Sequence, residues 1–189
     1  MLIRILSFLL ETLFFLLIAT ALLRAWMNGL RINMSGQPGR FVMALSDWLV
    51  KPLRRVLPQA LVKSRLDWAS LIAALVLALI YALVWAALFG ALLGGAAAAS
   101  GLGAGMIPGL LIFAVKMLLR VALQTAFIVV LGFAIVSWVQ PGSPLFAVLG
   151  RLSEPLLAPL RRVIPTVGGV DLSALVLLVA LQIGLMVLA

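Results

Sequence analysis

The chain has 189 residues, of which 66% are apolar and only 10% are charged, and its formal net charge is +9. Soluble globular domains carry about a quarter charged residues, so this composition predicts an integral membrane protein. Cysteine and histidine are both absent, which excludes disulfides, thiol nucleophiles, imidazole catalysis and the usual zinc sites. We therefore expect a non-enzymatic protein without a cofactor or a metal.

Four apolar stretches approach or exceed the length of about 20 residues that a transmembrane helix needs. They are residues 5–26, 68–93, 112–139 and 171–189. The Lys and Arg residues cluster beside these stretches, where the expected partner is an anionic lipid surface rather than nucleic acid. The pattern predicts an all-α membrane protein with four transmembrane helices.

The first stretch is similar to a secretory signal, because Arg4 precedes an apolar run that contains the small-residue triplet at 19–21. However, Glu11 interrupts the run, which continues to Trp26, and the second half of the chain contains a matching helix. We therefore interpret residues 5–26 as a retained transmembrane helix.

Residues 42–58 form an amphipathic segment, in which apolar residues recur at spacings of three and four and charged residues fall on the opposite side. This pattern is typical of a helix that lies in the membrane interface. Because Pro52 disfavours an unbroken helix interior, we expect a kinked or two-piece element. A second amphipathic segment, 147–165, contains further prolines, and Ser153 is placed to cap a piece that begins at Pro155.

The two amphipathic segments share one motif, Pro-Leu-Arg-Arg-Val-Leu-Pro at 52–58 and Pro-Leu-Arg-Arg-Val-Ile-Pro at 159–165. This self-similarity predicts two tandem parallel repeats, residues 1–93 and 110–189, joined by a Gly/Ala-rich connector at 94–109. Each repeat consists of a helix, an amphipathic segment and a second helix. The residues that define the repeat are Pro52, Pro58, Asp67, Pro159, Pro165 and Asp171.

The basic residues predict the orientation. Residues 27–67 carry seven Lys and Arg and residues 140–170 carry three, whereas residues 91–115 carry no charge. By the positive-inside rule, both basic loops are expected in the cytoplasm, with the termini and the connector outside. Without a Ser/Arg-rich transit segment, the expected location is the bacterial cytoplasmic membrane.

The doubled motif resembles the YggT family, also known as YlmG, of bacterial and plastid membrane proteins. An acid precedes each copy by five residues and an Asp opens the apolar stretch after it, and the resemblance covers nearly the whole chain. The chain departs from the family pattern at Asn33-Met34 and Gln140-Pro141, where Asn-Pro is expected. The resemblance implies an association with cell division, membrane or nucleoid organisation and assembly. In some bacteria it implies tolerance of osmotic shock and potassium uptake.

The arginine pairs of the motif are candidate docking residues. Our hypothesis is that they form one cytoplasmic surface for lipid phosphates or for acidic side chains of a partner, since a guanidinium binds both. The alternative is that they only fix topology and pair with Asp47 and Glu154. The candidate residues are Lys51, Arg54, Arg55, Arg161 and Arg162.

Asp67 and Asp171 stand at the mouths of apolar helices. There an aspartate satisfies backbone N–H groups and complements the helix dipole. We therefore favour helix caps over ion ligands at both positions.

A layer of polar residues is predicted inside the bilayer, with at least one member from each helix. Its members are Glu11, Tyr81, Arg120, Gln124 and Gln182. Because ionisable groups at such depth are costly unless they are paired, we expect an ion pair between Glu11 and Arg120 that holds the repeats together. The alternative is a path for protons or cations.

The second predicted helix carries small residues at every fourth position. They are Ala74, Ala78, Ala82, Ala86, Gly90 and Gly94. Such a face lets helix backbones approach closely in lipid. The expected partner is the fourth helix, through Ala180 and Gly184, or the same face of a second copy of the chain.

Two functional hypotheses remain open. The first is a scaffold that presents the basic motifs to lipid or to a cytoplasmic partner, and it depends on the arginines. The second is a transport-linked role in osmotic stress and potassium homeostasis, and it depends on the intramembrane polar layer.

Overall fold

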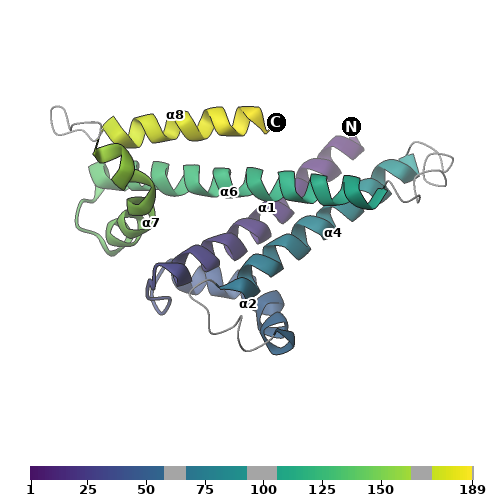
Figure 1. Ribbon diagram of the computed structural model, residues 1–189, viewed down its shortest axis with the longest axis horizontal. Helices are drawn as coiled ribbons and strands as arrows, with labels where there is room; N and C mark the ends of the chain where they lie inside the picture. Colours follow the sequence, from purple (N-terminus) through teal and green to yellow (C-terminus); the bar gives the residue numbers. More distant parts are fainter. Residues whose placement is uncertain (58–66, 93–105, 163–171, 189) are drawn as a thin grey trace.

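The computed structural model describes residues 1–57, 67–92, 106–162 and 172–188 (Figure 1). These residues form helices and no strands, so the predicted all-α class is confirmed. The helices are α1 (Leu2–Gly29), α2 (Gly39–Val56), α4 (Trp68–Leu92), α6 (Met106–Val139), α7 (Pro144–Arg161) and α8 (Leu172–Val187).

Three helices are long and apolar enough to cross a membrane. The candidate spans are Ile3–Gly29, Trp68–Leu88 and Ile107–Val139. Large apolar side chains lie exposed on these helices, for example Phe8 and Ile128, as expected for surfaces that face lipid. Helix α8 is also apolar but has only 16 residues, fewer than the roughly 20 that a perpendicular span takes.

The four apolar helices form two pairs. Helices α1 and α4 lie side by side, as do α6 and α8, and the two pairs cross (Figure 1). Helix α2 contacts α1 and α4, whereas α7 contacts α6 and α8. Figure 1 shows α2 and α7 at the end where α1 and α6 finish and α4 and α8 begin, with both termini toward the opposite end.

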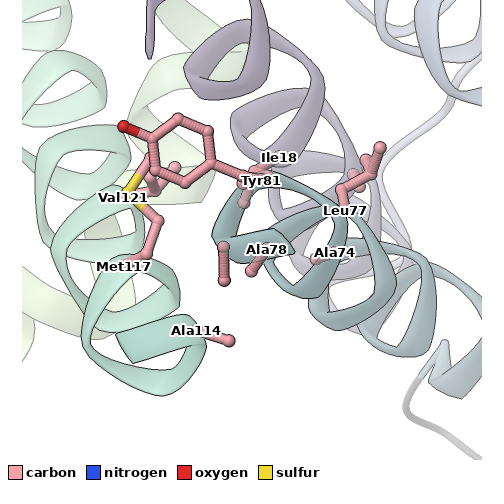
Figure 2. Packing of buried hydrophobic residues seen from close by; sticks show 10 residues of the cluster. Ile18, Ala74, Leu77, Ala78, Tyr81, Ala114, Met117 and Val121 are labelled. Carbon is pink, nitrogen blue, oxygen red and sulfur yellow. The ribbon is translucent and has the colours of Figure 1, made fainter. Parts of the chain in front are cut away.

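The main core lies where α4, which runs beside α1, crosses α6. Ala74 and Ala78 of α4 are fully buried, and they pack with Ile18 of α1 and with Ala114 and Val121 of α6 (Figure 2). Small side chains let the three backbones approach closely. The face of α4 therefore packs within the chain.

The predicted partner of this small-residue face was wrong. Its buried members pack against α1 and α6, and α8 packs instead on α6, where a Cβ at Gly184 would lie 3.2 Å from Leu123. The physical reason is the crossing, which inserts α6 between α4 and α8. Ala82 is also buried in this core and Ala86 is half-buried, Gly90 lies in α4, and Gly94 lies outside the described residues.

The amphipathic segments were predicted to be kinked or two-piece, and the two-piece form was wrong. Helices α2 and α7 are each continuous, with Pro52, Pro155 and Pro159 inside them. All three prolines are exposed, so the carbonyls that lose a helical hydrogen bond can be hydrated. Accordingly, Ser153 caps nothing, and its Oγ donates to the Leu149 carbonyl at 2.8 Å.

A second apolar cluster fixes both amphipathic helices at one end of the molecule. Met27 of α1 and Val42 of α2 pack there with Val129 of α6 and Leu152 of α7. The cluster therefore joins the two halves of the chain beside the basic motifs.

The crossing predicts the effect of a larger side chain on α4. We expect Ala78→Leu to lower the free energy of unfolding by about 1–3 kcal/mol, because the site has no room for three more carbons. Ala180→Leu, on an exposed face of α8, is the matched control and should change little. Thermal unfolding in detergent measures both, and equal midpoints would contradict the packing described.

Candidate functional site

Helix α2 turns one face toward the apolar helices and the other away from them. Val42, Ser46 and Val50 are buried, whereas Phe41 and Trp48 are exposed by 56% and 58%. The buried and exposed positions follow the helical period. The apolar face of α2 therefore continues the core, and its basic residues remain at the surface.

A buried arginine joins α1 to α2. Arg24 is only 5% exposed, and its Nη1 donates to Asp47 Oδ1 at 2.7 Å and to Ser46 Oγ at 2.8 Å. Lys51 Nζ lies 2.7 Å from the other oxygen of Asp47. The Lys51 hydrogen bond and the Arg24 guanidinium together hold the pKa of Asp47 below its ordinary value, although burial acts in the opposite direction.

Asp67 forms a second junction, which joins α1, α2 and α4. Its Oδ2 accepts from Asn28 Nδ2 at 2.6 Å, from Arg54 Nη2 at 2.7 Å and from Ser70 Oγ at 2.8 Å. The carboxylate side chain is only 7% exposed. Burial raises the pKa of Asp67, but the hydrogen bonds and the Arg54 cation outweigh burial, so the pKa lies below its ordinary value.

Asp67 also lies at the start of α4, where a capping role was predicted. Its Oδ1 is 3.4 Å from the Ser70 backbone nitrogen, which donates to it. The three other donors show that the residue does more than cap a helix. Among the described residues, no three acidic side chains gather as metal ligands.

The candidate docking arginines have different surroundings. Arg54 binds Asp67 as described, and Arg161 Nη1 lies 2.8 Å from Glu154 Oε2. Arg55 and Arg162 are exposed, and within the described part of the chain neither makes an ion pair. All four arginines are exposed, and two of them pair with an acid of the same chain, Arg161 with an acid of its own helix. Pro58, Pro165 and Asp171 lie outside the described residues.

The second basic helix lies on α6 and α8 through Leu152 and Leu157, which are fully buried. Arg151 Nη2 reaches the Leu30 carbonyl of the first half at 3.5 Å. Helix α7 is therefore anchored by apolar contacts and by one long hydrogen bond to the loop after α1.

The predicted polar layer lines three cavities that share Arg120. The largest, about 660 Å³, also has Gln124 and Gln182 on its wall. A cavity of about 270 Å³ adds Glu11 to Arg120 and Gln124, and one of about 240 Å³ has Glu11 and Tyr81 beside Arg120. In the described residues no ion pair joins Glu11 to Arg120. The residues of the predicted polar layer therefore line cavities, and the expected ion pair between Glu11 and Arg120 is not formed in the described residues.

Arg24, Asn28 and Ser46 were missed by the sequence reasoning. Arg24 was counted as part of the apolar run 5–26, although a cation inside a predicted span must find an anion. Asp47 was considered only as a partner for the motif arginines. The spacing within α1 offered a signal, because Arg24 and Asn28 are four residues apart and therefore lie on one helix face.

The junction at Arg24 predicts an asymmetry between two variants. Asp47→Leu leaves the Arg24 cation buried without an anion, and we expect a loss of about 3 kcal/mol in the free energy of unfolding. Arg24→Leu should cost less, because Asp47 keeps Lys51. The double variant should recover part of the loss, and unfolding in mixed micelles measures all three. Simple additivity of the two losses would contradict coupling between these residues.

Asp67 predicts a pH dependence. A carboxylate with a lowered folded pKa stabilises the fold above its unfolded pKa of about 4, and this stabilisation is lost as the pH falls through the lower folded value. The thermal midpoint in detergent should therefore fall between about pH 5 and about pH 3. Asp67→Asn should lower the midpoint at pH 7 and flatten the slope below pH 5. A variant with the wild-type slope would show that Asp67 does not contribute.

Comparison with known proteins identifies the family. The chain matches the model of the CCB3/YggT family over residues 1–88 and 112–189. An uncharacterised protein of Vibrio alginolyticus is 34% identical over 177 residues, which cover 93% of this chain and 89% of that protein. YggT of Escherichia coli strain K12, itself described as uncharacterised, is 34% identical over 179 residues, with coverages of 94% and 86%. An uncharacterised Pseudomonas aeruginosa protein is 32% identical over 178 residues, with coverages of 93% and 84%. No solved structure matches the chain. The expected resemblance is confirmed, and the chain belongs to the CCB3/YggT family.

Proposed function

We propose that this chain is a non-enzymatic multi-pass protein of the bacterial inner membrane that binds anionic lipid headgroups through α2 and α7. In this proposal α1, α4, α6 and α8 are four spans arranged as two tandem repeats. The basic loops face the cytoplasm and the termini face outward. A scaffold of this kind suits a role in membrane organisation, cell division or assembly.

One observation carries the proposal. The second arginine of each motif, Arg55 and Arg162, is exposed and makes no ion pair within the described residues. The first arginine of each motif is bound to an acid of the same chain, at Asp67 or Glu154. One arginine of each pair is therefore bound to an acid, Arg54 to Asp67 before α4 and Arg161 to Glu154 of its own helix, and the other is available to a phosphate.

The neighbours of these arginines favour lipid over a protein partner. Trp48 on α2 and Trp138 at the end of α6 are exposed by 58% and 78%. Tryptophan is enriched at the level of the headgroups, where its ring meets both lipid and water. Helices that combine exposed aromatic and basic residues in this way lie on anionic membranes. An acidic cytoplasmic protein is the alternative partner.

The short helix α8 is compatible with a fourth span. Its 16 residues reach about 24 Å, a few ångströms short of the roughly 30 Å of hydrocarbon. A bilayer thins locally around short spans at modest cost, and α8 lies against the much longer α6. This supports reading α8 as a span.

A transport-linked role is the second hypothesis, and it would use the cavities around Arg120. Those cavities carry Lys116 and Arg120 against the single acid Glu11. Cationic walls raise the electrostatic barrier for a potassium ion. The proposal therefore favours lipid docking over potassium conduction.

The proposal is tested by measuring lipid selectivity in reconstituted membranes. Spin-labelled phosphatidylglycerol and phosphatidylcholine report the relative association of each lipid with the protein. We expect Arg55→Gln and Arg162→Gln each to lower selectivity for phosphatidylglycerol about fivefold, because each basic residue near an anionic surface contributes about 1 kcal/mol.

Arg4→Gln is the matched control, because it removes one exposed charge at the opposite end of the molecule. We expect this variant to leave the association of phosphatidylglycerol with α2 and α7 unchanged. Unchanged selectivity in all three variants would exclude lipid docking by these arginines and would leave the acidic protein partner.

A further inference from the structure

A cavity of about 660 Å³ lies between α6 and α8, far along the spans from the basic motifs. Its polar wall consists of Arg120 and Gln124 from α6 and Gln182 from α8. Two further cavities share Arg120 with it. Three groups that can donate hydrogen bonds therefore converge on one space from two helices.

Arg120 is a cation on the wall of all three cavities. Within the part of the chain that the structure describes, its guanidinium makes no ion pair and no hydrogen bond, although it has five N–H donors. Glu11 and Lys116 line an adjoining cavity with Arg120, so the three ionisable groups carry a net charge of +1. An unpaired cation among apolar groups is costly, and the site is therefore complementary to an anion.

The carboxyl end of α8 lies beside Arg120, since Leu185 and Met186 line the same cavity. A helix end carries only about half a negative charge. It offsets part of the Arg120 charge and leaves room for a full anion.

The remainder of the wall is apolar. Phe127 and Ile128 of α6 line the cavity together with Val179 and Ile183 of α8. Its volume of about 660 Å³ falls within the usual range of about 300–1,000 Å³ for small-molecule sites. A ligand with a charged head and an apolar tail would match both parts of the wall.

The depth of Arg120 fits a phospholipid from the leaflet opposite the basic motifs. Arg120 lies 18 residues before Trp138 in α6, a rise of about 27 Å. Trp138 marks the near edge of a hydrocarbon layer about 30 Å thick. The guanidinium thus lies close to the far edge, where lipid phosphates are found.

We infer that this cavity binds one anionic phospholipid. Arg120 pairs with its phosphate, Gln124 and Gln182 donate to the phosphate oxygens, and one acyl chain lies in the groove between α6 and α8. The site is separate from the surface of α2 and α7, and the inference goes beyond the proposed function.

Native mass spectrometry of the full chain in a non-ionic detergent tests the inference, with phosphatidylglycerol and phosphatidylcholine of identical acyl chains as probes. We expect the wild type to retain one phosphatidylglycerol in preference to phosphatidylcholine. Arg120→Gln should weaken its binding about tenfold, because a charged hydrogen bond is lost. Glu11→Gln should strengthen it, because a competing carboxylate is removed.

Two further variants separate this site from the basic surface. Val179→Phe fills the groove without changing the charge and should displace the lipid, which also serves as the test if Arg120→Gln fails to fold. The double variant Arg55→Gln/Arg162→Gln should retain it. Equal retention of both lipids, wild-type binding by Arg120→Gln or by Val179→Phe, or loss of the lipid only in the double variant would each overturn the inference.

Discussion

The arrangement of the basic helices depends on the burial of one cation. Arg24 lies inside α1 with almost no exposed surface, and a charge in such surroundings must be neutralised. The neutralising carboxylate, Asp47, belongs to α2. If α2 left the apolar helices, the Arg24 cation would therefore lose its carboxylate. The orientation of α2 in turn determines which motif residues reach Asp67 and which face outward.

The crossing of the helix pairs has a separate consequence for the apolar region. Small residues on α4 bring it close to both α1 and α6, whereas cavities open around Arg120 between α6 and α8 and between α1 and α6. The two candidate binding regions thus follow from two kinds of packing. A tight charged junction positions the surface motif, and a loose apolar junction leaves space within the membrane.

Much of this organisation could be predicted from the sequence, because hydropathy, periodicity and the doubled motif are local signals. The all-α class, the apolar helices and the amphipathic character of 42–58 all rest on such signals. The partner of α4 could not be predicted, because a face of small residues indicates that another helix packs closely against it but does not identify that helix. The role of Pro52 was misjudged for a related reason, since the effect of a proline depends on whether the freed carbonyl can be hydrated. Arg24 and Asn28 bind residues distant in the sequence, so only the folded chain shows their contacts.

The ion pair that Glu154 makes in α7 differs from the pair that Asp47 of α2 makes with Arg24. When the two repeats are aligned so that Trp26 of α1 matches Trp138 of α6, the position of Arg24 is occupied by Val136. Glu154, which like Asp47 lies five residues before its motif, is 57% exposed. Its partner Arg161 belongs to the same helix, so moving α7 away from α6 and α8 would break no described ion pair, whereas moving α2 would break the buried pair of Arg24 and Asp47. The first motif is therefore held to the apolar helices by charge as well as by packing, whereas the second is held by the buried Leu152 and Leu157 and by the Arg151 hydrogen bond.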